Sequence, residues 1–202
     1  MTTSAQDITW LNRVESLFLR YGIKSITMDD VARELGISKK TLYQFVESKD
    51  ALVIKVLDQH ISREKSERIC LAEEATNAIE EIFVIMNCNS QELTQMKTNI
   101  INDLQKYHHD AWAMIRNFHY DFVLKVIRDN IKRGRKEGLY REDFDQDIIA
   151  KLHLATAFDL FDEQLFPAGS TSKVTLFKEY MMHFLHGIVS AKGLAYLKKK
   201  LS

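Results

Sequence analysis

The stretch T-M-D-D-V-A-R-E-L-G-I-S-K-K-T-L-Y-Q-F-V-E-S-K-D-A-L, residues 27–52, decides how this chain folds. Thr27 is a suitable N-cap because its hydroxyl can accept a hydrogen bond from a free backbone N–H, and the aspartate three residues later can complete a capping box. Gly36 can end this first helix in the left-handed conformation, which costs least without a Cβ. Ser38 and Ser48 are further N-caps. The stretch predicts two short helices joined by a tight turn, followed at once by a long helix.

The second short helix is expected to have an apolar inner side and a polar outer side. Ala32 is small enough to lie where two helices cross at a steep angle. The residues expected to form the shared core are Val31, Leu35, Ile37, Leu42 and Phe45. The outer side carries Lys39, Lys40, Thr41, Tyr43 and Gln44. These side chains suit phosphates and base edges, so the pattern predicts a helix-turn-helix whose second helix enters the major groove of DNA.

The run from Ile26 to Leu52, with the helix ending in F-L-R-Y-G before it, resembles the N-terminal domain of tetracycline-repressor (TetR) family regulators. Members of that family often carry two aromatic residues before the S-K-D/E element, whereas this chain has Phe45-Val46. A valine in place of the second ring changes packing more than DNA contact. The resemblance implies a DNA-binding domain over residues 1–48 and a helical ligand-binding and dimerisation domain over residues 49–202.

Composition supports an all-α fold. The chain has 202 residues with one proline and seven glycines, so it has few helix breakers. Apolar periodicity predicts helices over residues 8–21, 49–69, 72–86, 91–107 and 110–136, then from Asp145 or Asp147 to 164, and from Thr171 or Ser172 onward with a bend at Gly193. Residues 87–90 are expected to break the chain between two helices, and residues 165–170 to form a loop.

The charge balance restricts how this chain can bind DNA. It has 28 basic and 28 acidic residues, so there is no overall attraction to a polyanion. A DNA-binding protein of zero net charge must concentrate its basic residues on one face. Lys39, Lys40 and Lys49 could provide that face, with only Glu47 and Asp50 nearby.

The TetR resemblance also assigns DNA contacts residue by residue. It implies that Thr27, Lys39, Tyr43 and Lys49 meet phosphates. It places Lys40, Thr41 and Gln44 where base edges are read, and lysine can donate to guanine while glutamine can pair with adenine. Ser38, the cap of the second helix, completes the predicted DNA-binding set.

The middle helices are rich in aromatic and flexible side chains. The resemblance implies that they enclose a cavity for a small hydrophobic effector, and the expected ligand-binding residues are Phe83, Met86, Leu104, Trp112, Phe118, Phe122 and Phe158. An aromatic stripe at helical spacing also fits ordinary core packing, and the sequence leaves both interpretations open. Ligand binding would favour a conformer whose two DNA-binding heads are wrongly spaced, which releases the operator.

The last two long helices are apolar over wide arcs. The residues on these arcs are Leu152, Ala155, Phe158 and Phe161 on one helix, and Phe177, Met181, Phe184 and Ile188 on the other. We expect these helices to form a homodimer interface, so that two heads read a palindromic operator of double-stranded DNA. The alternative is that the arcs face only their own core.

Motifs for catalysis or metal binding are weak in this sequence. His108-His109 is expected to be a helix cap or surface pair, and His183 with His186 supplies too few ligands for a metal without a partner motif. Cys70 and Cys88 are expected to be buried free thiols. We therefore expect no enzyme activity, no cofactor and no metal; a helical-bundle enzyme or metal-binding protein is the alternative. With no signal-peptide pattern and no long apolar run, we expect a cytoplasmic protein without membrane contact.

Overall fold

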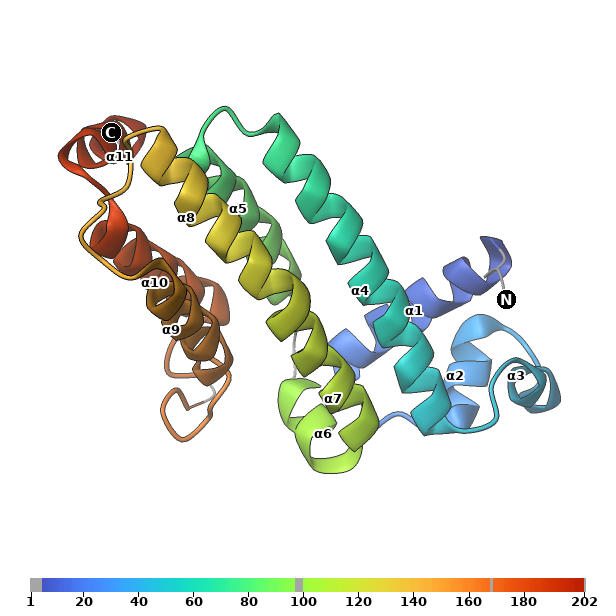
Figure 1. Ribbon diagram of the computed structural model, residues 1–202. Coiled ribbons are helices and arrows are strands. Elements are labelled where there is room, and N and C mark those ends of the chain that lie inside the picture. The colour runs from blue at the N-terminus through green and yellow to red at the C-terminus, as the bar shows by residue number, and fades with distance from the viewer. Residues whose placement is uncertain (1–4, 97–99, 168, 202) are drawn as a thin grey trace. The chain divides into compact units, whose positions relative to one another are not determined.

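The computed structural model describes residues 5–96, 100–167 and 169–201. In this part of the chain every long element is a helix, and one isolated antiparallel bridge joins Tyr140 to Val189. The helices, drawn in Figure 1, are α1 (Ala5–Tyr21), α2 (Met28–Leu35), α3 (Lys39–Phe45), α4 (Lys49–Glu74), α5 (Ala78–Gln95), α6 (Ile100–Tyr107), α7 (His109–Phe118), the π-helical segment η1 (His119–Val123), α8 (Leu124–Lys136), α9 (Gln146–Asp159), α10 (Lys173–Ile188) and α11 (Ala191–Leu201). The all-α prediction is confirmed.

The chain divides into two compact units. The first takes the described residues up to Lys65 together with those of Gln95–Phe118. The second takes Ser66–Thr94 and the described residues from His119 onward. The division falls inside α4, and the functional boundary near residue 48 stays a prediction.

The first unit is built around the helix-turn-helix. Its capping prediction is confirmed at each cap: Thr27 and Asp30 form a capping box, Gly36 ends α2 with φ 71°, and the Ser38 hydroxyl accepts from the N–H of Thr41 at 3.0 Å. Ser48 opens α4 in the same way by accepting from Ala51 at 3.1 Å. The short helices are therefore held at both ends by local hydrogen bonds, as their sequence requires.

The core of this unit includes the residues expected from the sequence and two elements that come much later in the chain. Val31, Leu35 and Leu42 are buried, whereas Ile37 and Phe45 are half-buried and Val46 takes the inner position at 3% exposure. Leu104 of α6 and Ala111 of α7 join the same cluster. Burial of their side chains makes α6 and α7 part of the hydrophobic support of the helix-turn-helix.

A polar cluster joins α1 to α4 within the first unit. Glu15 of α1 accepts from Arg63 at 2.7 and 3.0 Å and lies 2.8 Å from Nδ1 of His60. Burial raises the pKa of Glu15, but the hydrogen bonds from His60 and Arg63 outweigh it and bring the pKa down to about 2. Glu15 is therefore ionised over the physiological pH range.

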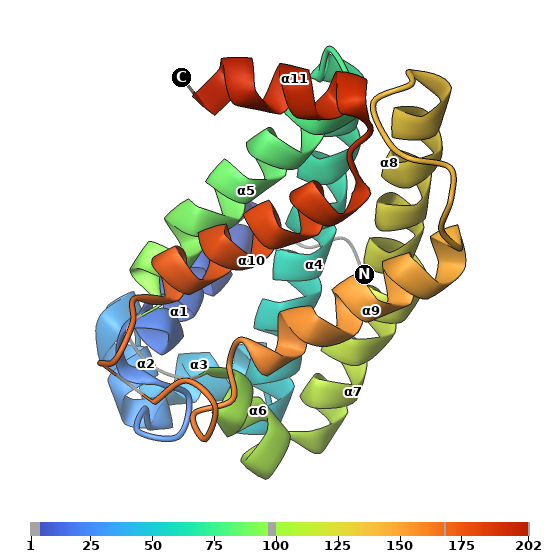
Figure 2. The same ribbon diagram turned by 90° about the vertical axis from the view of Figure 1, so that its left-hand side faces the viewer.

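The second unit packs α5, α8, α9, α10 and α11 around an apolar core. Ile79, Ile131, Leu185 and Leu197 are fully buried there. Figure 2 shows α11 leaving the end of α10 in a new direction. The predicted bend at Gly193 is wrong in place: the chain turns at Val189 and Ser190, and Gly193 lies inside α11 where an added Cβ would meet the Leu139 carbonyl oxygen at 2.0 Å. Glycine is needed there for close packing, not for bending.

The boundary between α4 and α5 also differs from the prediction. Helix α4 continues to Glu74, and α5 begins at Ala78 because Asn77 caps it by accepting from the N–H groups of Ile79 and Glu80. The break expected over residues 87–90 is wrong, since α5 runs through it to Gln95. Part of the helix expected over residues 91–107 falls on residues 97–99, outside the described residues. The single helix expected over residues 110–136 is interrupted by η1.

Other expectations about single residues need correction or are confirmed. Both cysteines are exposed, so the expectation of buried thiols is wrong. His108 is buried, with Nδ1 2.5 Å from Oδ1 of Asp50, so it is no surface residue. It lies directly before α7, where its carbonyl oxygen accepts from the N–H of Trp112 at 2.9 Å, which fits the alternative of a helix cap. The caps predicted for α9 and α10 are confirmed at Asp145 and Ser172.

Candidate nucleic-acid interface and ligand pocket

Helix α3 is short, and its position is fixed by one buried side chain and by the turn and cap at its start. Leu42 has no exposed surface and anchors the helix in the core of the first unit. The Ser38 cap and the turn after Gly36 set where the helix begins. Because Leu42 faces inward, the opposite side of the helix faces outward.

Most of the predicted base- and phosphate-contacting residues are exposed. Lys39, Lys40, Tyr43 and Gln44 are exposed, and Tyr43 has 44% of its surface accessible. Thr41 is half-buried, and its hydroxyl lies 2.8 Å from that of Ser38. The outer side of α3 thus presents two ammonium groups, a phenol and an amide, and its sequence contains no carboxylate.

The charge of Lys39 is shared with the preceding helix. Its Nζ lies 2.8 Å from Oδ1 of Asp29, and this hydrogen bond raises the pKa of Lys39. Both side chains are more than half exposed. An exposed ion pair of this kind is weak and salt-screened, so a phosphate can replace Asp29 as the partner of Lys39.

Thr27 and Lys49 lie at the starts of α2 and α4. The Thr27 hydroxyl accepts from the N–H of Asp30 and lies 2.6 Å from its carboxylate, so its first role is to cap α2. Lys49 is half-buried, and its Nζ lies 3.4 Å from the carbonyl oxygen of Lys24. Burial lowers the pKa of Lys49 against the attraction of Asp103 and Asp50.

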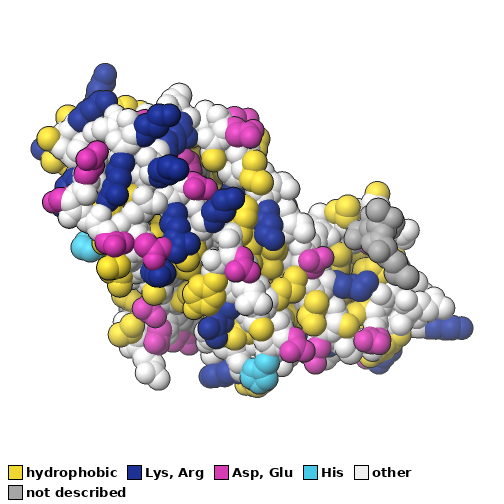
Figure 3. Space-filling view, in the orientation of Figure 1, with side chains coloured by type: hydrophobic (Ala, Val, Ile, Leu, Met, Phe, Trp, Pro, Cys, Tyr) yellow, Lys and Arg dark blue, Asp and Glu magenta, His cyan; other side chains and the backbone are white. Residues whose placement is uncertain are grey.

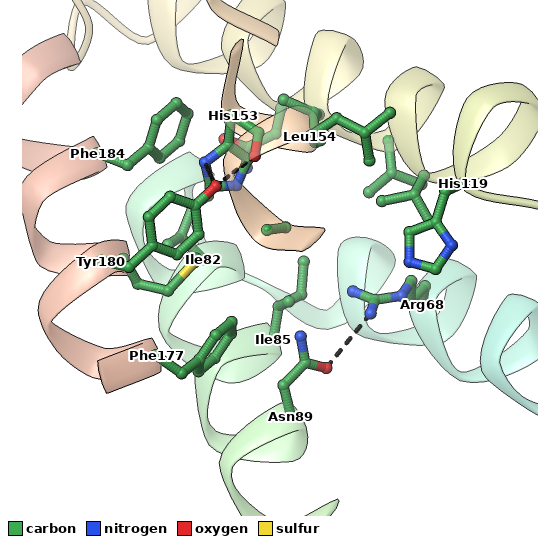
Figure 4. Close-up of a pocket in the computed structure, with 16 residues that line it drawn as sticks. Arg68, Ile82, Ile85, Asn89, His119, His153, Leu154, Phe177, Tyr180 and Phe184 are labelled. Atoms are coloured by element: carbon green, nitrogen blue, oxygen red, sulfur yellow. Dashed lines mark hydrogen bonds between the residues drawn. The ribbon is translucent and has the colours of Figure 1, made fainter. Parts of the chain in front are cut away.

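The second unit contains a pocket with a cavity volume of about 110 Å³. Its walls come from the end of α4, from α5, from η1 and α8, and from α9 and α10 (Figure 4). The described lining residues are Arg68, Ile82, Ile85, Asn89, His119, Val123, Val126, Ile127, Asn130, His153, Leu154, Ala157, Phe177, Tyr180, Met181 and Phe184. The pocket is mostly apolar with a few polar groups, which is the usual character of a small-molecule site.

One end of the pocket is aromatic and neutral. The His153 ring stacks on Phe184 with ring centroids 3.8 Å apart, and the Tyr180 hydroxyl lies 2.5 Å from both Nδ1 and the carbonyl oxygen of His153. The carbonyl can only accept, so the phenol donates to it and Nδ1–H donates to the phenol oxygen. Burial lowers the pKa of His153 to about 3 and raises that of Tyr180, so both are uncharged at neutral pH.

The other end of the pocket is polar. Arg68 of α4 donates to Oδ1 of Asn89 of α5 at 3.3 Å, and His119 lies on the same side (Figure 4). His119 opens the π-helical segment η1, which also supplies Val123 to the lining. Segments of π-helix within longer helices are often found at functional sites.

The residues expected from the sequence to bind ligand do not line this pocket. Leu104 and Phe118 are buried in the first unit, where Trp112 packs partly buried against the same core as Leu104. Phe83 and Met86 belong to the core of the second unit. Phe122 and Phe158 are half-buried in the second unit, and Phe158 contacts the His119 ring at 4.8 Å. A ligand-binding role for these seven residues stays a prediction.

The pocket instead uses residues that the sequence assigned to the dimer interface. Phe177, Met181 and Phe184 of α10 are buried within their own protomer and line the cavity. With Ile188, which is also buried, they cannot form an outer face of α10, so that part of the prediction is wrong. The apolar face that remains exposed lies on α9, where Ile148 and Leu152 are 56% and 58% accessible.

Basic residues are not confined to the helix-turn-helix. Figure 3 shows Lys and Arg side chains spread over the face of the molecule that carries α8, interleaved with Asp and Glu. Asp147 pairs with both Arg128 and Lys151, and Arg133 pairs with Glu81 and Glu137. Arg128 and Arg133 of α8 are therefore paired with carboxylates of their own unit.

Some polar side chains of the second unit hold its helices together. Arg133 donates to the carbonyl oxygens of Ala72 and Ala75 at 3.1 and 2.6 Å, which satisfies the C-terminal end of α4. Its partner Glu81 is only 4% exposed, and burial raises the pKa of Glu81 against the hydrogen bond from Asn130 and the charge of Arg133. Arg133 and Glu81 fix the α4–α5 corner and are not among the described lining residues of the pocket, whereas Asn130 is one of them.

Comparisons with known proteins agree with this architecture. Residues 14–56 match the family model described as "Bacterial regulatory proteins, tetR family". The chain is 28% identical over 144 residues to the HTH-type transcriptional regulator YvaF of Bacillus subtilis, covering 69% of this chain and 73% of YvaF. It is 22% identical over 190 residues to the HTH-type transcriptional repressor KstR2 of Mycolicibacterium smegmatis, covering 91% and 90%.

Solved structures show the same fold. A transcriptional regulator from Saccharomonospora viridis, solved in complex with choline, superposes with a TM-score of 0.74 at 18% identity over 94% of this chain and 100% of that one. Within the described residues no helix is both long and apolar enough to span a membrane. The helix-turn-helix geometry, the exposed polar face of α3 and these relatives together identify the chain as a member of the TetR family of DNA-binding transcriptional regulators.

Proposed function

We propose that this protein is a homodimeric repressor that binds a palindromic operator through α3 and releases it when a small molecule enters the pocket of the second unit. The observation that carries the DNA-binding part is the outer face of α3, where Lys39, Lys40, Tyr43 and Gln44 are exposed on a helix whose sequence has no carboxylate. Phosphates position such a helix and base edges give it specificity. Thr27, Ser38, Thr41 and Lys49 lie at or beside the ends of these helices and are proposed as further contacts.

The roles within α3 are separable by experiment. Operator sequences are selected from random duplexes with the purified full-length protein and then titrated with variants. Gln44→Ala should cost about 1–3 kcal/mol on the selected operator and little on unrelated DNA, because a bidentate base contact is lost. Lys132→Ala on exposed α8 removes a charge far from α3 in sequence and is the control. Equal losses from Gln44→Ala on every sequence would refute its role in base reading.

A homodimer is proposed because one helix-turn-helix reads only half a palindrome. The exposed stripe of Ile148 and Leu152 on α9 supports an interface there, since large apolar side chains at more than half exposure gain most from a partner surface. Light scattering of the wild-type chain should give the dimer mass, and Leu152→Glu should shift it toward monomer. Ile69→Glu, at another exposed apolar residue on α4, should leave the mass unchanged. A wild-type monomer at micromolar concentration would overturn this proposal.

Release of the operator by an effector is proposed because the second unit has a pocket and because ligand binding can be thermodynamically linked to DNA binding. A ligand shifts the DNA equilibrium only if it binds the DNA-free conformer more tightly than the DNA-bound one. The S. viridis regulator was solved with a small molecule bound, which supports a ligand site in proteins of this fold. Compounds that bind the full chain are tested for operator release, with Ala157→Leu as the variant that fills the pocket. Pocket ligands are the compounds that bind the wild type and no longer bind Ala157→Leu. The proposal fails if none of these compounds changes the affinity for the operator.

A further inference from the structure

We propose that the effector of this pocket is a small uncharged alcohol or phenol, whose hydroxyl donates a hydrogen bond to Nε2 of His153 and whose apolar body packs against Phe177 and Phe184. This inference rests on the proposed role of the pocket as an effector site. It adds the chemical class of the effector, which follows from the hydrogen bonds that polar lining residues already make and from the size of the cavity.

The first argument is the tautomer of His153. The Tyr180 hydroxyl lies 2.5 Å from both Nδ1 and the carbonyl oxygen of His153. Because a phenol has one proton and a carbonyl oxygen can only accept, the phenol donates to the carbonyl, and Nδ1 carries the proton that is donated to the phenol oxygen. Burial lowers the pKa of His153 to about 3, so at neutral pH the ring holds no second proton. The other ring nitrogen, Nε2, is therefore a hydrogen-bond acceptor.

The second argument is that Nε2 lies on the free edge of the imidazole ring. The Phe184 ring stacks on His153 with centroids 3.8 Å apart, and the Tyr180 ring lies nearly parallel to it at 5.0 Å and 12° (Figure 4). The Nδ1 edge is taken by the Tyr180 hydroxyl, and no hydrogen bond from the described residues reaches Nε2. His153 lines the pocket, so a ligand that fills the cavity without a donor would leave this acceptor unpaired.

A second polar residue of the lining is already satisfied by the protein. The amide nitrogen of Asn130 donates to the carbonyl oxygen of Ala78 at 3.0 Å, and its amide oxygen accepts from the Tyr140 hydroxyl at 3.0 Å. Asn130 is also buried, so a ligand would have to break these bonds to use it. His153 offers an acceptor without that cost.

The third argument concerns the charge of the ligand. Arg68 donates to Oδ1 of Asn89 at 3.3 Å, so the guanidinium is already bound within the protein and requires no anion from a ligand. A carboxylate has no proton to donate and would be repelled by the lone pair of Nε2. An ammonium group could donate, but among the described lining residues none is Asp or Glu, so its charge would be buried without a partner. An uncharged hydroxyl donates without either cost.

The size of the cavity limits the apolar body of the ligand. A cavity of 110 Å³ is smaller than the engineered cavity of about 150 Å³ that holds benzene. The body is therefore no larger than a single ring or a short branched chain. Ligands of drug size need pockets of roughly 300 Å³ or more, so long acyl chains would require the helices around the cavity to separate.

The test compares phenol with toluene, which has a methyl group in place of the hydroxyl and nearly the same shape. Isothermal titration of the full-length protein at neutral pH should show that phenol binds more tightly than toluene, and more tightly than the charged probes benzoate and benzylamine. His153→Phe keeps an aromatic ring but removes the acceptor. It should weaken phenol by roughly 10- to 100-fold and leave toluene within about threefold, so the order of the two affinities reverses. His183→Phe, the same change at an exposed residue of α10 outside the described lining, should alter neither affinity.

A second measurement uses the wild-type protein and so does not depend on how a variant folds. A long-range proton–nitrogen NMR spectrum should show His153 protonated at Nδ1 and unprotonated at Nε2, and phenol should shift the Nε2 signal more than toluene does. A proton on Nε2 in the free protein, or phenol binding that leaves the Nε2 signal unmoved, overturns the inference. Failure of phenol to bind at millimolar concentration overturns it as well.

The location is tested by Ala157→Leu, which fills the cavity and should abolish binding of both phenol and toluene. Phenol that binds this variant with wild-type affinity refutes the proposed site. If toluene or a charged probe binds the wild type more tightly than phenol and is lost in Ala157→Leu, the hydroxyl class is wrong while the effector pocket stands. If phenol binds as expected but pocket ligands never alter operator affinity, the ligand class stands and the repressor mechanism fails.

Discussion

Replacing Gly134 by alanine should destabilise the second unit severely, although alanine is the better helix former. A Cβ at this position in α8 would lie 2.1 Å from Cδ2 and 2.3 Å from Cε2 of Tyr140. That ring is 2% exposed, and its hydroxyl lies 3.1 Å from the carbonyl oxygen of Ala78 and 3.0 Å from Oδ1 of Asn130. The ring therefore cannot move aside without losing both its packing and its hydrogen bonds.

The expected magnitude follows from three contributions. Overpacking of a tight core costs about 1–3 kcal/mol. Displacing the phenol from its buried partners adds roughly 1–3 kcal/mol. Greater helix propensity returns about 1 kcal/mol. The net loss in unfolding free energy should be about 1–5 kcal/mol, which for a chain of this size lowers Tm by roughly 2–20 °C.

Urea unfolding followed by circular dichroism, at one protein concentration, measures this loss. Lys132→Ala in the same helix is exposed and should stay within about 0.5 kcal/mol of wild type. The clash is isolated by a double-mutant cycle: in a Tyr140→Ala background, Gly134→Ala should cost nothing or stabilise. The reasoning is refuted if Gly134→Ala unfolds with wild-type stability, or if its cost is the same with and without the Tyr140 ring.

Three further predictions concern the DNA-binding unit. Glu15→Gln should destabilise the protein near neutral pH. Because the folded-state pKa of Glu15 is lowered from 4.5 to about 2, the difference in stability from wild type should shrink as pH falls from 4.5 toward 2. Urea unfolding at several pH values measures this difference, and a difference independent of pH would contradict the prediction. Asp29→Asn should tighten operator binding severalfold at low salt, because Lys39 then loses a competing partner and DNA meets one less carboxylate. Gel-shift titration at two salt concentrations measures the effect, and an effect that grows with salt would count against the prediction. Lys49→Ala should weaken binding to all DNA sequences alike and reduce the slope of log K against log salt by about one. Fluorescence-anisotropy titrations measure both quantities, and a loss of affinity for the operator alone would instead indicate a base contact.

The predictions that succeeded depended on local chemistry. Thr27, Gly36 and Ser38 determine the ends of α2 and α3 through hydrogen bonds or backbone angles within four residues, so the sequence alone was enough to place them. The same applies to the caps of α9 and α10. The caps of α2 and α3 place Leu42 inward and Lys40 and Gln44 outward, so the exposed face of α3 could be predicted from the sequence.

The predictions that failed depended on contacts between distant parts of the chain. Residues 87–90 have the composition of a turn, yet α5 passes through them, and Ser90 is buried by neighbours that its local sequence cannot reveal. The wide apolar arc of α10 was ambiguous for a related reason: periodicity shows that one side of a helix is buried but not whether its own core or a partner buries it. The pocket residues Phe177 and Phe184 were assigned to the wrong surface by that ambiguity.

Leu104 shows that the core supporting the helix-turn-helix is not continuous along the sequence. It was expected to contact a ligand, but it is 1% exposed in the core that supports the helix-turn-helix. Nearby, Asp103 accepts from the backbone N–H of Lys24 at 2.9 Å, Tyr107 lies 2.9 Å from Nζ of Lys24, and His108 contacts Asp50 at the start of α4. Because α6 belongs to the compact unit that carries α3, the core that supports the helix-turn-helix depends on residues more than 50 positions after the predicted boundary near residue 48.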